Sequence, residues 1–301
     1  MTISQSDIID TSAESLKQYD GFNFTSFDSL AEAIEFGNKR QLNPDFSRDS
    51  HSTNESFTGT PNWRYMEKVA ENGWTKGRAL VAASLETIFQ TGAAQLAAGE
   101  AIEYDIAGHY PDAALAASGE TFAMVNAGDL AADKPIIKLV VNLAASCHVN
   151  KKFLANRGAA IAALVDQIES AGNSCEIHAV SPSTNDSKKE KNYLQCECVV
   201  LKRAGERLGI DEIAFGLGHP SMLRRVCLAI MENDPWLYNK GFNLGYGLPR
   251  DLKADVLPAD SIYINRLNNS HSYSTPELAM ETIQNTYRQQ AEAKGFVEVA
   301  Q

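Results

Sequence analysis

The segment Ser146-Cys147-His148 places a thiol beside an imidazole, the two groups of a nucleophile–base pair. It follows an apolar run that we expect to form a strand, and neighbouring residues of a strand point to opposite faces. Cys147 and His148 are therefore poorly placed to share a proton. The sequence contains no G-x-S-x-G nucleophile elbow. We predict a protein that is not an enzyme and has no catalytic residue; an enzyme is the least favoured of three hypotheses.

Two glycine-rich segments, residues 216–220 and 241–247, lack the motifs of a nucleotide site. Neither ends in the Gly-Lys-Ser/Thr of a P-loop, and neither is a dinucleotide fingerprint that follows a strand. Five cysteines, an odd number, argue against a disulfide framework. The stretch Cys196-Glu197-Cys198 is too tight by itself for a structural zinc site. We therefore predict no cofactor and a reducing, cytoplasmic location.

Positive charge and aromatic rings occur close together in the second half of the chain. Lys188, Lys189 and Lys191 form the tip of a polar loop, and Tyr193 follows closely. Trp236 lies near a long aromatic loop. Lysines that follow a phosphate backbone and rings that stack on bases are typical of single-strand binding. The structural alternative, a solvated charge run with rings folded onto the core, stays open.

Arg224 and Arg225 lie on a predicted amphipathic helix over residues 220–232. Apolar residues form the core-facing stripe of this helix, so the two arginines project from its sides. Either they add to an anion-binding face, or one pairs with a carboxylate and the other is solvated. The predicted nucleic-acid-binding set is therefore Lys188, Lys189, Lys191, Tyr193, Arg224, Arg225 and Trp236.

The chain has 301 residues and a formal net charge of −11, and the whole excess of acid lies in its first half. Residues 1–134 carry 9 Lys and Arg against 20 Asp and Glu, whereas residues 135–301 carry 18 of each kind. We predict an acidic, helical N-terminal region over 1–134, packed on the core, and a second domain over 135–301. An anion-binding surface is expected in the second domain.

The second domain alternates between apolar strands and helices. Residues 136–143 are apolar almost throughout, as in a strand that is covered on both faces. A helix over 150–171 comes next, and further strands are expected over 174–181, 193–202 and 261–264. This alternation predicts an α/β fold, a mainly parallel open sheet with helices on both faces.

The apolar strand is followed by a polar run that ends in Ser146, by a helix, and by Gly-Asn-Ser-Cys-Glu-Ile-His-Ala-Val over 172–180. These features resemble the opening of a von Willebrand factor A domain. In that family the first strand ends in Asp-x-Ser-x-Ser, which holds a divalent cation. The matching positions here are Asn142, Ala144 and Ser146, so a carboxylate and one serine are missing. The resemblance implies an A-like fold whose degenerate site holds no metal.

Several segments between about residues 60 and 265 together resemble an uncharacterised phage-encoded family with a degenerate A domain. The segments are Asn72-Gly73-Trp74 with Gly77, Tyr104-Asp105-Ile106-Ala107-Gly108, Ser118-Gly119-Glu120, Asn156-Arg157-Gly158-Ala159-Ala160 and His219-Pro220-Ser221-Met222-Leu223-Arg224-Arg225. The resemblance implies a fold and a phage origin, and it implies no known reaction.

We therefore expect a non-catalytic phage binding protein. The preferred hypothesis is an accessory factor of phage transcription or replication that binds single-stranded nucleic acid, chosen by analogy with phage proteins of this size. The alternative is a protein–protein adaptor that uses the strand ends of a metal-free A-like domain. The expected partners are single-stranded nucleic acid and a phage or host protein such as a polymerase, with no membrane involved. The sequence leaves the oligomeric state open.

Overall fold

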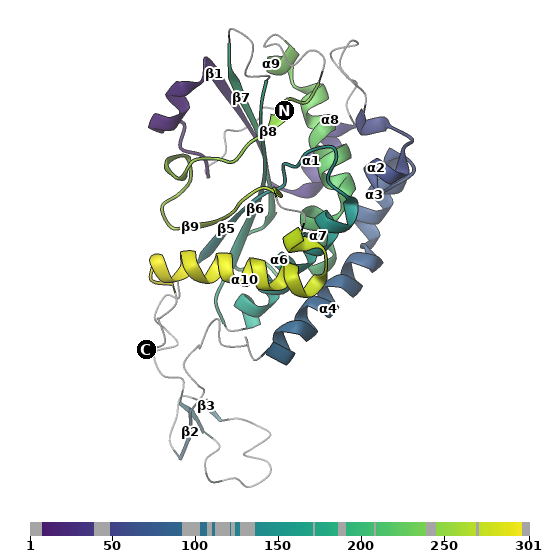
Figure 1. Ribbon diagram of the computed structural model, residues 1–301. Helices are drawn as coiled ribbons and strands as arrows, with labels where there is room; N and C mark the ends of the chain where they lie inside the picture. Colours follow the sequence, from purple (N-terminus) through teal and green to yellow (C-terminus); the bar gives the residue numbers. More distant parts are fainter. Residues whose placement is uncertain are drawn as a thin grey trace.

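The computed structural model describes residues 8–38, 49–91, 103–106, 110–111, 121, 124–126, 136–170, 172–185, 191–207, 209–238, 245–268 and 271–296. A six-stranded sheet lies at its centre, flanked by helices (Figure 1). In sheet order the strands are β1 (Gly21–Phe27), β7 (Tyr193–Lys202), β6 (Cys175–Thr184), β5 (Ile137–Asn142) and β9 (Ser261–Ile264), and β8 (Leu248–Pro249) pairs with the end of β6.

The sheet is mostly parallel, as the sequence predicts. β5 pairs in parallel with β6 and β9, and β1 pairs in parallel with β7. β6 and β7 run antiparallel. A parallel pair requires a crossover of about a dozen residues or more, whereas only residues 185–192 join these two strands. The chain therefore turns back as a hairpin at this point.

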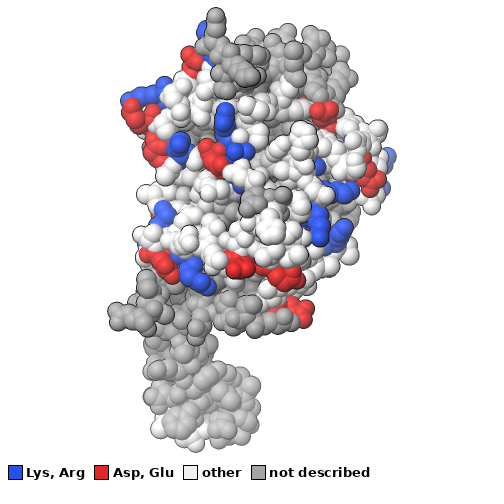
Figure 2. Space-filling view, viewed as in Figure 1, with Lys and Arg blue, Asp and Glu red and all other residues white. Residues whose placement is uncertain are grey.

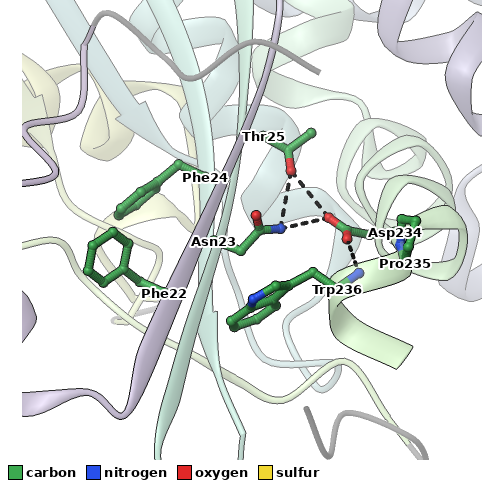
Figure 3. A pocket seen from close by; sticks show the side chains of 7 residues that line it. All are labelled: Phe22, Asn23, Phe24, Thr25, Asp234, Pro235 and Trp236. Atoms are coloured by element: carbon green, nitrogen blue, oxygen red, sulfur yellow. Dashed lines mark hydrogen bonds between the residues drawn. The ribbon is translucent and has the colours of Figure 1, made fainter. Parts of the chain in front are cut away.

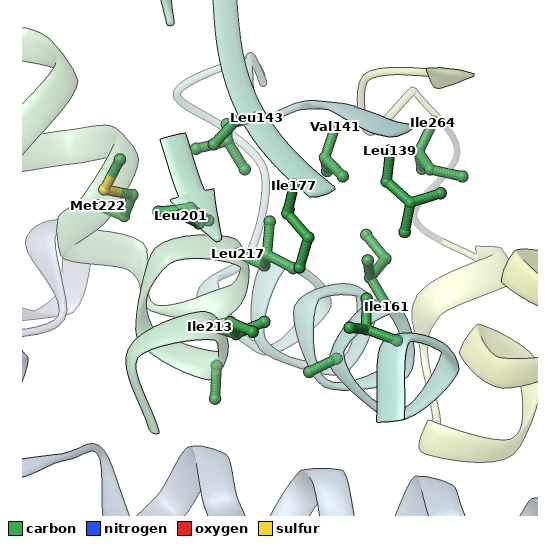
Figure 4. Packing of buried hydrophobic residues seen from close by; sticks show 14 of the residues in the cluster. Leu139, Val141, Leu143, Ile161, Ile177, Leu201, Ile213, Leu217, Met222 and Ile264 are labelled. Carbon is green, nitrogen blue, oxygen red and sulfur yellow. The ribbon is translucent and has the colours of Figure 1, made fainter. Parts of the chain in front are cut away.

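One face of the sheet carries the main hydrophobic core (Figure 4). Leu139 and Val141 of β5 and Ile177 of β6 point into it, and helices lie over them. β5 is an interior strand between β6 and β9, as predicted from its apolar sequence. The α-helices whose side chains belong to this core are α1 (Leu30–Gly37), α3 (Trp63–Asn72), α4 (Thr75–Thr91), α6 (Lys151–Ser170), α7 (Ile210–Gly218), α8 (Leu228–Asn233) and α10 (Pro276–Ala293).

Side-chain caps fix where several of these helices begin. The Ser29 side chain accepts a hydrogen bond from the backbone N–H of Glu32, and Thr275 caps α10 in the same way with Pro276 in its first turn. Asn62 caps α3. Each cap satisfies a backbone donor that the helix leaves unpaired, so these short polar segments set the helix boundaries.

The opposite face of the sheet differs from the prediction of helices on both faces. Its core contains Phe24, Val140 and Val180, and short 3₁₀ helices cover it within the described ranges: η1 (Glu14–Gln18) and η5 (Ala254–Val256). Ile8, Ile9, Leu16 and Leu252 provide the covering apolar side chains. They are too widely spaced along the chain to form an amphipathic α-helix.

The N-terminal region is not helical throughout, in contrast to the prediction for residues 1–134. β1 belongs to it and pairs with β7. A second, three-stranded sheet also lies there, in the order β2 (Glu103–Asp105), β4 (Met124–Asn126) and β3 (Tyr110–Pro111). The alternation of Phe22 and Phe24 with Asn23 and Thr25 explains β1, because side chains of a strand alternate between its faces. The boundary at residue 134 stays a prediction.

The predicted helix over 220–232 has a π-helical first part. The π-helix η4 (Met222–Cys227) contains Arg224 and Arg225 and continues into α8. Short helices complete the description: η2 (Asp49–His51), α2 (Glu55–Thr58), α9 (Pro235–Tyr238) and η6 (His271–Tyr273). Within the described ranges no helix is both long enough and apolar enough to cross a bilayer.

Candidate binding site

Hydrogen bonds of the Asn142 side chain close the carboxyl end of β5. The Asn142 amide, fully buried, donates to the carbonyl oxygen of Arg250 (2.7 Å), to the hydroxyl of Tyr263 (2.8 Å) and to the carboxylate of Asp251 (3.3 Å). Its Oδ1 accepts from the backbone N–H of Ala144 (2.9 Å). Asn142 therefore joins β5 to β9 and to the segment after β8. In the part of the chain that the structure describes, no three His, Cys, Asp or Glu side chains form a group that could hold a metal ion.

Ser146, Cys147 and His148 lie in an exposed turn beyond the strand. The Cys147 Sγ atom and the Ser146 Oγ atom each lie 3.4 Å from Nδ1 of His148. The expectation that strand geometry separates Cys147 from His148 is therefore wrong, because both residues belong to a turn. The other four cysteines are buried, so Cys147 is the accessible thiol of the chain.

Arg224 holds this turn from the interior. The residue is only 4% exposed, and its guanidinium donates to the carbonyl oxygens of Phe57 (2.8 Å) and Val149 (2.5 Å). Its guanidinium carbon lies 4.5 Å from the centroid of the Phe57 ring. Arg224 therefore links the turn after β5 to the α2 segment, and its donors face protein carbonyls rather than solvent.

Arg225 is fully buried and plays a similar internal part. Its three guanidinium nitrogens donate to five neutral acceptors at 2.6–2.9 Å: the carbonyl oxygens of Ser50, Ser52 and Thr60 and the hydroxyls of Thr58 and Thr60. Both arginines of the predicted nucleic-acid set thus hold the 50–60 segment onto η4. Because neither guanidinium reaches the surface, this geometry gives no support to a phosphate contact by Arg224 or Arg225.

Tyr193 and Trp236, which the sequence assigns to the same predicted set, lie together. Their ring centroids are 5.8 Å apart and the rings stand edge to face at 86°. Tyr193 is buried, Trp236 is half-buried, and Lys191 is exposed two residues before Tyr193. Lys188 and Lys189 lie outside the described residues. The structure therefore joins the two aromatic residues of the set and separates them from the two arginines, which it buries.

Trp236 borders an open hollow of about 350 Å³ beside β1 (Figure 3). We call it the β1 hollow; its lining residues are Phe22, Asn23, Phe24, Thr25, Asp234, Pro235 and Trp236. Phe22 and Phe24 lie on one side of the strand, and Asn23 and Thr25 lie on the other with Asp234. Because consecutive residues from both faces line it, the hollow runs along the edge of β1 rather than over one face of the sheet.

Asp234 forms the polar wall of the β1 hollow. Its Oδ2 atom accepts from Asn23 Nδ2 (2.8 Å) and from the Thr25 hydroxyl (3.2 Å). Its Oδ1 atom accepts from the backbone N–H of Trp236 (2.8 Å), which caps the start of α9. Burial raises the pKa of Asp234 above its ordinary value, although these hydrogen bonds oppose that effect.

A hydrogen-bonded chain leads from this wall to a second buried acid. Asn23 Nδ2 also donates to Gln195 Oε1 (2.8 Å), and Gln195 Nε2 donates to Glu197 Oε1 (2.9 Å). Burial raises the pKa of Glu197 to about 8, and the charge of Asp234 contributes to this increase. Glu197 Oε2 is buried without a hydrogen-bond partner. Glu197 is therefore largely protonated at neutral pH, as an unpaired buried carboxyl must be.

The β1 hollow lies at the end of the sheet where β6 terminates. Ser183 near the carboxyl end of β6 pairs with Gln195, and Gln195 pairs with Asn23.

Asp234 is the one charged residue among those that line the hollow. Over the described part of the face in Figure 2, basic and acidic side chains are interspersed rather than gathered into a basic stripe. The local charge of the hollow is therefore negative.

Sequence reasoning missed Asn23, Asp234 and Glu197. Glu197 is the one charged residue in the otherwise uncharged run 193–201, and a charge inside a buried strand is a signal of an unusual environment. Asn23 was detectable only through the alternation that identifies β1. Asp234 precedes a proline in a polar segment and offers no signal by itself.

A family model described as "Domain of unknown function (DUF7192)" matches residues 16–290, which is most of the chain. The match includes β1, the whole six-stranded sheet, the β1 hollow and the turn after β5. No curated protein and no solved structure matches the chain.

Proposed function

We propose that this chain, which belongs to the DUF7192 family, is a non-catalytic adaptor that docks a protein partner in the β1 hollow. The observation that carries the proposal is the hollow itself, which runs along the edge strand of the sheet beside a half-buried tryptophan. Edge strands and half-buried aromatic residues are recurrent features of protein-binding surfaces. No cysteine, histidine or lysine lines this hollow.

Electrostatics favour a protein partner over a nucleic acid at this surface. Affinity for a nucleic acid comes largely from Lys and Arg contacts to phosphates. Arg224 and Arg225 are buried, the wall of the hollow carries Asp234, and the chain has a net charge of −11. Lys191 and the aromatic pair Tyr193 and Trp236 remain from the described part of the predicted set. Binding of single-stranded nucleic acid is therefore the alternative that the experiment below must exclude.

The proposal also includes a von Willebrand A-like fold and a phage origin for this chain. The A-like fold is supported by β5, an apolar interior strand that is followed by α6 and by the parallel strand β6. Asn142 ends β5, where the alignment with von Willebrand A domains has an aspartate, and its side chain is held by hydrogen bonds within the protein. In this proposal the end of β5 no longer binds the divalent cation of von Willebrand A domains. The partner docks in the β1 hollow and not at the end of β5.

Site-specific photo-crosslinking tests the proposed docking. A benzophenone amino acid replaces Phe22, which lines the hollow, and in the matched control it replaces Tyr65, which is 52% exposed on α3. After illumination in an extract of the native host, we expect a discrete protein adduct from position 22 that survives nuclease treatment. Unmodified parent protein should compete the adduct away, and the Trp236→Ala variant should not.

Two results would contradict the proposal. An adduct that disappears with nuclease treatment would identify a nucleic acid as the partner. Equal adducts from positions 22 and 65, or equal competition by parent and Trp236→Ala, would show that the hollow has no specific role.

A further inference from the structure

We propose that the partner presents an extended segment that pairs with β1 as an additional strand, and that a basic side chain of this segment lies over Trp236 and points toward Asp234. The inference rests on the proposed docking in the β1 hollow and names the kind of partner. It uses three observations: the position of β1 in the sheet, the charge of the hollow and the acceptors that face it.

β1 is at the edge of the six-stranded sheet. Within the described ranges residues 22–25 of β1 pair only with β7, and no other described segment forms a backbone hydrogen bond with these four residues. An edge strand directs one row of N–H and C=O groups away from its neighbour, where an extended peptide can pair with them. The hollow lies along this row at residues 22–25.

The charge of the hollow selects a basic side chain. Asp234 is only 4% exposed, and no Lys or Arg is among the lining residues. Burial raises the pKa of its carboxyl, so a cation nearby would restore the stabilisation that water no longer gives. The Trp236 ring offers a second attraction, because a guanidinium or ammonium group binds favourably over an indole face.

The Asn23 side-chain oxygen can accept a hydrogen bond from the basic side chain of the partner. Both hydrogens of Asn23 Nδ2 are used within the chain Asp234–Asn23–Gln195, but Asn23 Oδ1 accepts from no described donor. An arginine carries five donors and can bind such an acceptor beside a carboxylate. An acidic side chain would meet repulsion from Asp234, and an apolar one would cover this carboxylate without compensating its charge.

A displayed library of random peptides tests the inference without knowledge of the natural partner. Peptides are selected on the parent protein and counter-selected on Trp236→Ala. We expect the enriched peptides to carry Arg or Lys between β-branched or aromatic residues. Replacing that Arg by its neutral isostere citrulline should weaken binding about tenfold, the effect of losing one favourable charge contact. Asp234→Asn, which keeps the acceptor that caps α9, should weaken the same peptide by a similar factor and leave the citrulline peptide unaffected.

The outcomes separate the inference from the proposed function. Enriched peptides without a basic residue, or a peptide that binds Asp234→Asn as tightly as the parent, would overturn the inference and leave docking in the hollow intact. If the parent enriches no peptide beyond Trp236→Ala, the hollow does not bind extended chains and the inference is wrong, while the crosslinking from position 22 still decides whether a folded partner docks there. Tyr65→Ala is the control for a surface aromatic outside the hollow, and it should bind the selected peptides like the parent.

Discussion

Arg225 and Glu197 both bring an ionisable group into the interior, and neither has an ion-pair partner in the part of the chain that the structure describes. The two groups differ in how they are stabilised there. Arg225 stays charged, because five neutral oxygens surround its guanidinium. Glu197 gives up its charge, because burial raises the pKa of its carboxyl and one of its oxygens has no donor among the described residues. Sequence reasoning could not detect the first case. The acceptors of Arg225 lie 165–175 residues away, and most are backbone carbonyls of an irregular segment.

Replacing Arg225 by methionine should lower the free energy of unfolding by about 3 kcal/mol, because it leaves several buried oxygens without a donor. Urea denaturation measures the change. Arg64→Ala on α3 is the matched control; Arg64 is exposed, and its removal should change stability by less than about 0.5 kcal/mol. If Arg225→Met were as mild as Arg64→Ala, the buried hydrogen bonds of Arg225 would have no structural importance, and its prediction as a phosphate ligand would regain support.

Glu197 should make stability fall as pH rises. Its pKa in the native protein is about 8, against an ordinary value of 4.5. Between these values the unfolded chain loses the proton and the native protein keeps it, so unfolding becomes easier with increasing pH. The full effect is on the order of 5 kcal/mol. Glu197→Gln mimics the protonated form and should remove this part of the pH dependence.

The measurement for Glu197 is urea denaturation of parent and Glu197→Gln at several pH values from about pH 5 to about pH 10. The variant should gain stability relative to the parent as pH increases, and the difference should level off above the native pKa. Other groups titrate in the same range, and the comparison of two proteins cancels their contributions. A difference that does not change with pH would contradict the burial of an unpaired carboxyl at this position.

At the scale of the elements, periodicity and caps predict most of the regular structure. The predicted strands over 193–202 and 261–264 coincide with β7 and β9, and the helix over 150–171 differs from α6 by one residue at each end. These segments have long apolar runs or clear stop signals. β1 was missed because its alternation covers only a few residues, and its pairing with β7 joins segments about 170 residues apart.

The contact between α6 and α7 depends on two glycines. A Cβ atom at Gly158 of α6 would collide with backbone atoms of Gly218 of α7, whereas one at Gly218 would lie 3.2 Å from the Gly158 Cα atom. Gly158→Ala should therefore destabilise the protein by about 2–3 kcal/mol, although alanine favours a helix by roughly 1 kcal/mol over glycine. Gly218→Ala should be milder, and thermal or urea unfolding of the two variants measures the contrast. A neutral or stabilising Gly158→Ala would mean that α6 and α7 are not packed backbone to backbone.

For the whole molecule, the distribution of charge decides between the two kinds of partner. The net charge is −11, and the two arginines of the predicted nucleic-acid set are internal. A prediction from sequence counts charges but cannot tell which of them reach the surface, and this explains why Arg224 and Arg225 share no surface with the other described residues of the set. The same limit applies to the β1 hollow, since its polar side chains, at positions 23, 25 and 234, come from distant segments.

A labelled single-stranded oligonucleotide should not bind to the parent protein at about 50 mM salt, where electrostatic contacts are strong. Fluorescence anisotropy over a series of salt concentrations measures this. Binding that weakens steeply with salt would restore the nucleic-acid hypothesis. In that case the Lys188/Lys189/Lys191 triple alanine variant would show whether the basic loop carries the contact, since each lost phosphate contact flattens the salt dependence by about one unit.

Amide hydrogen exchange of β1 tests the central claim of docking along the sheet edge most directly. The parent protein is compared with and without the partner that crosslinks to position 22, and exchange is followed at residues 22–25 and on α3. We predict that bound partner slows exchange at the outward-facing amides of β1 and leaves α3 unchanged, because new backbone hydrogen bonds form only along the hollow. Unchanged exchange at residues 22–25 in a saturated complex would contradict strand addition at β1 and place the partner elsewhere on the molecule.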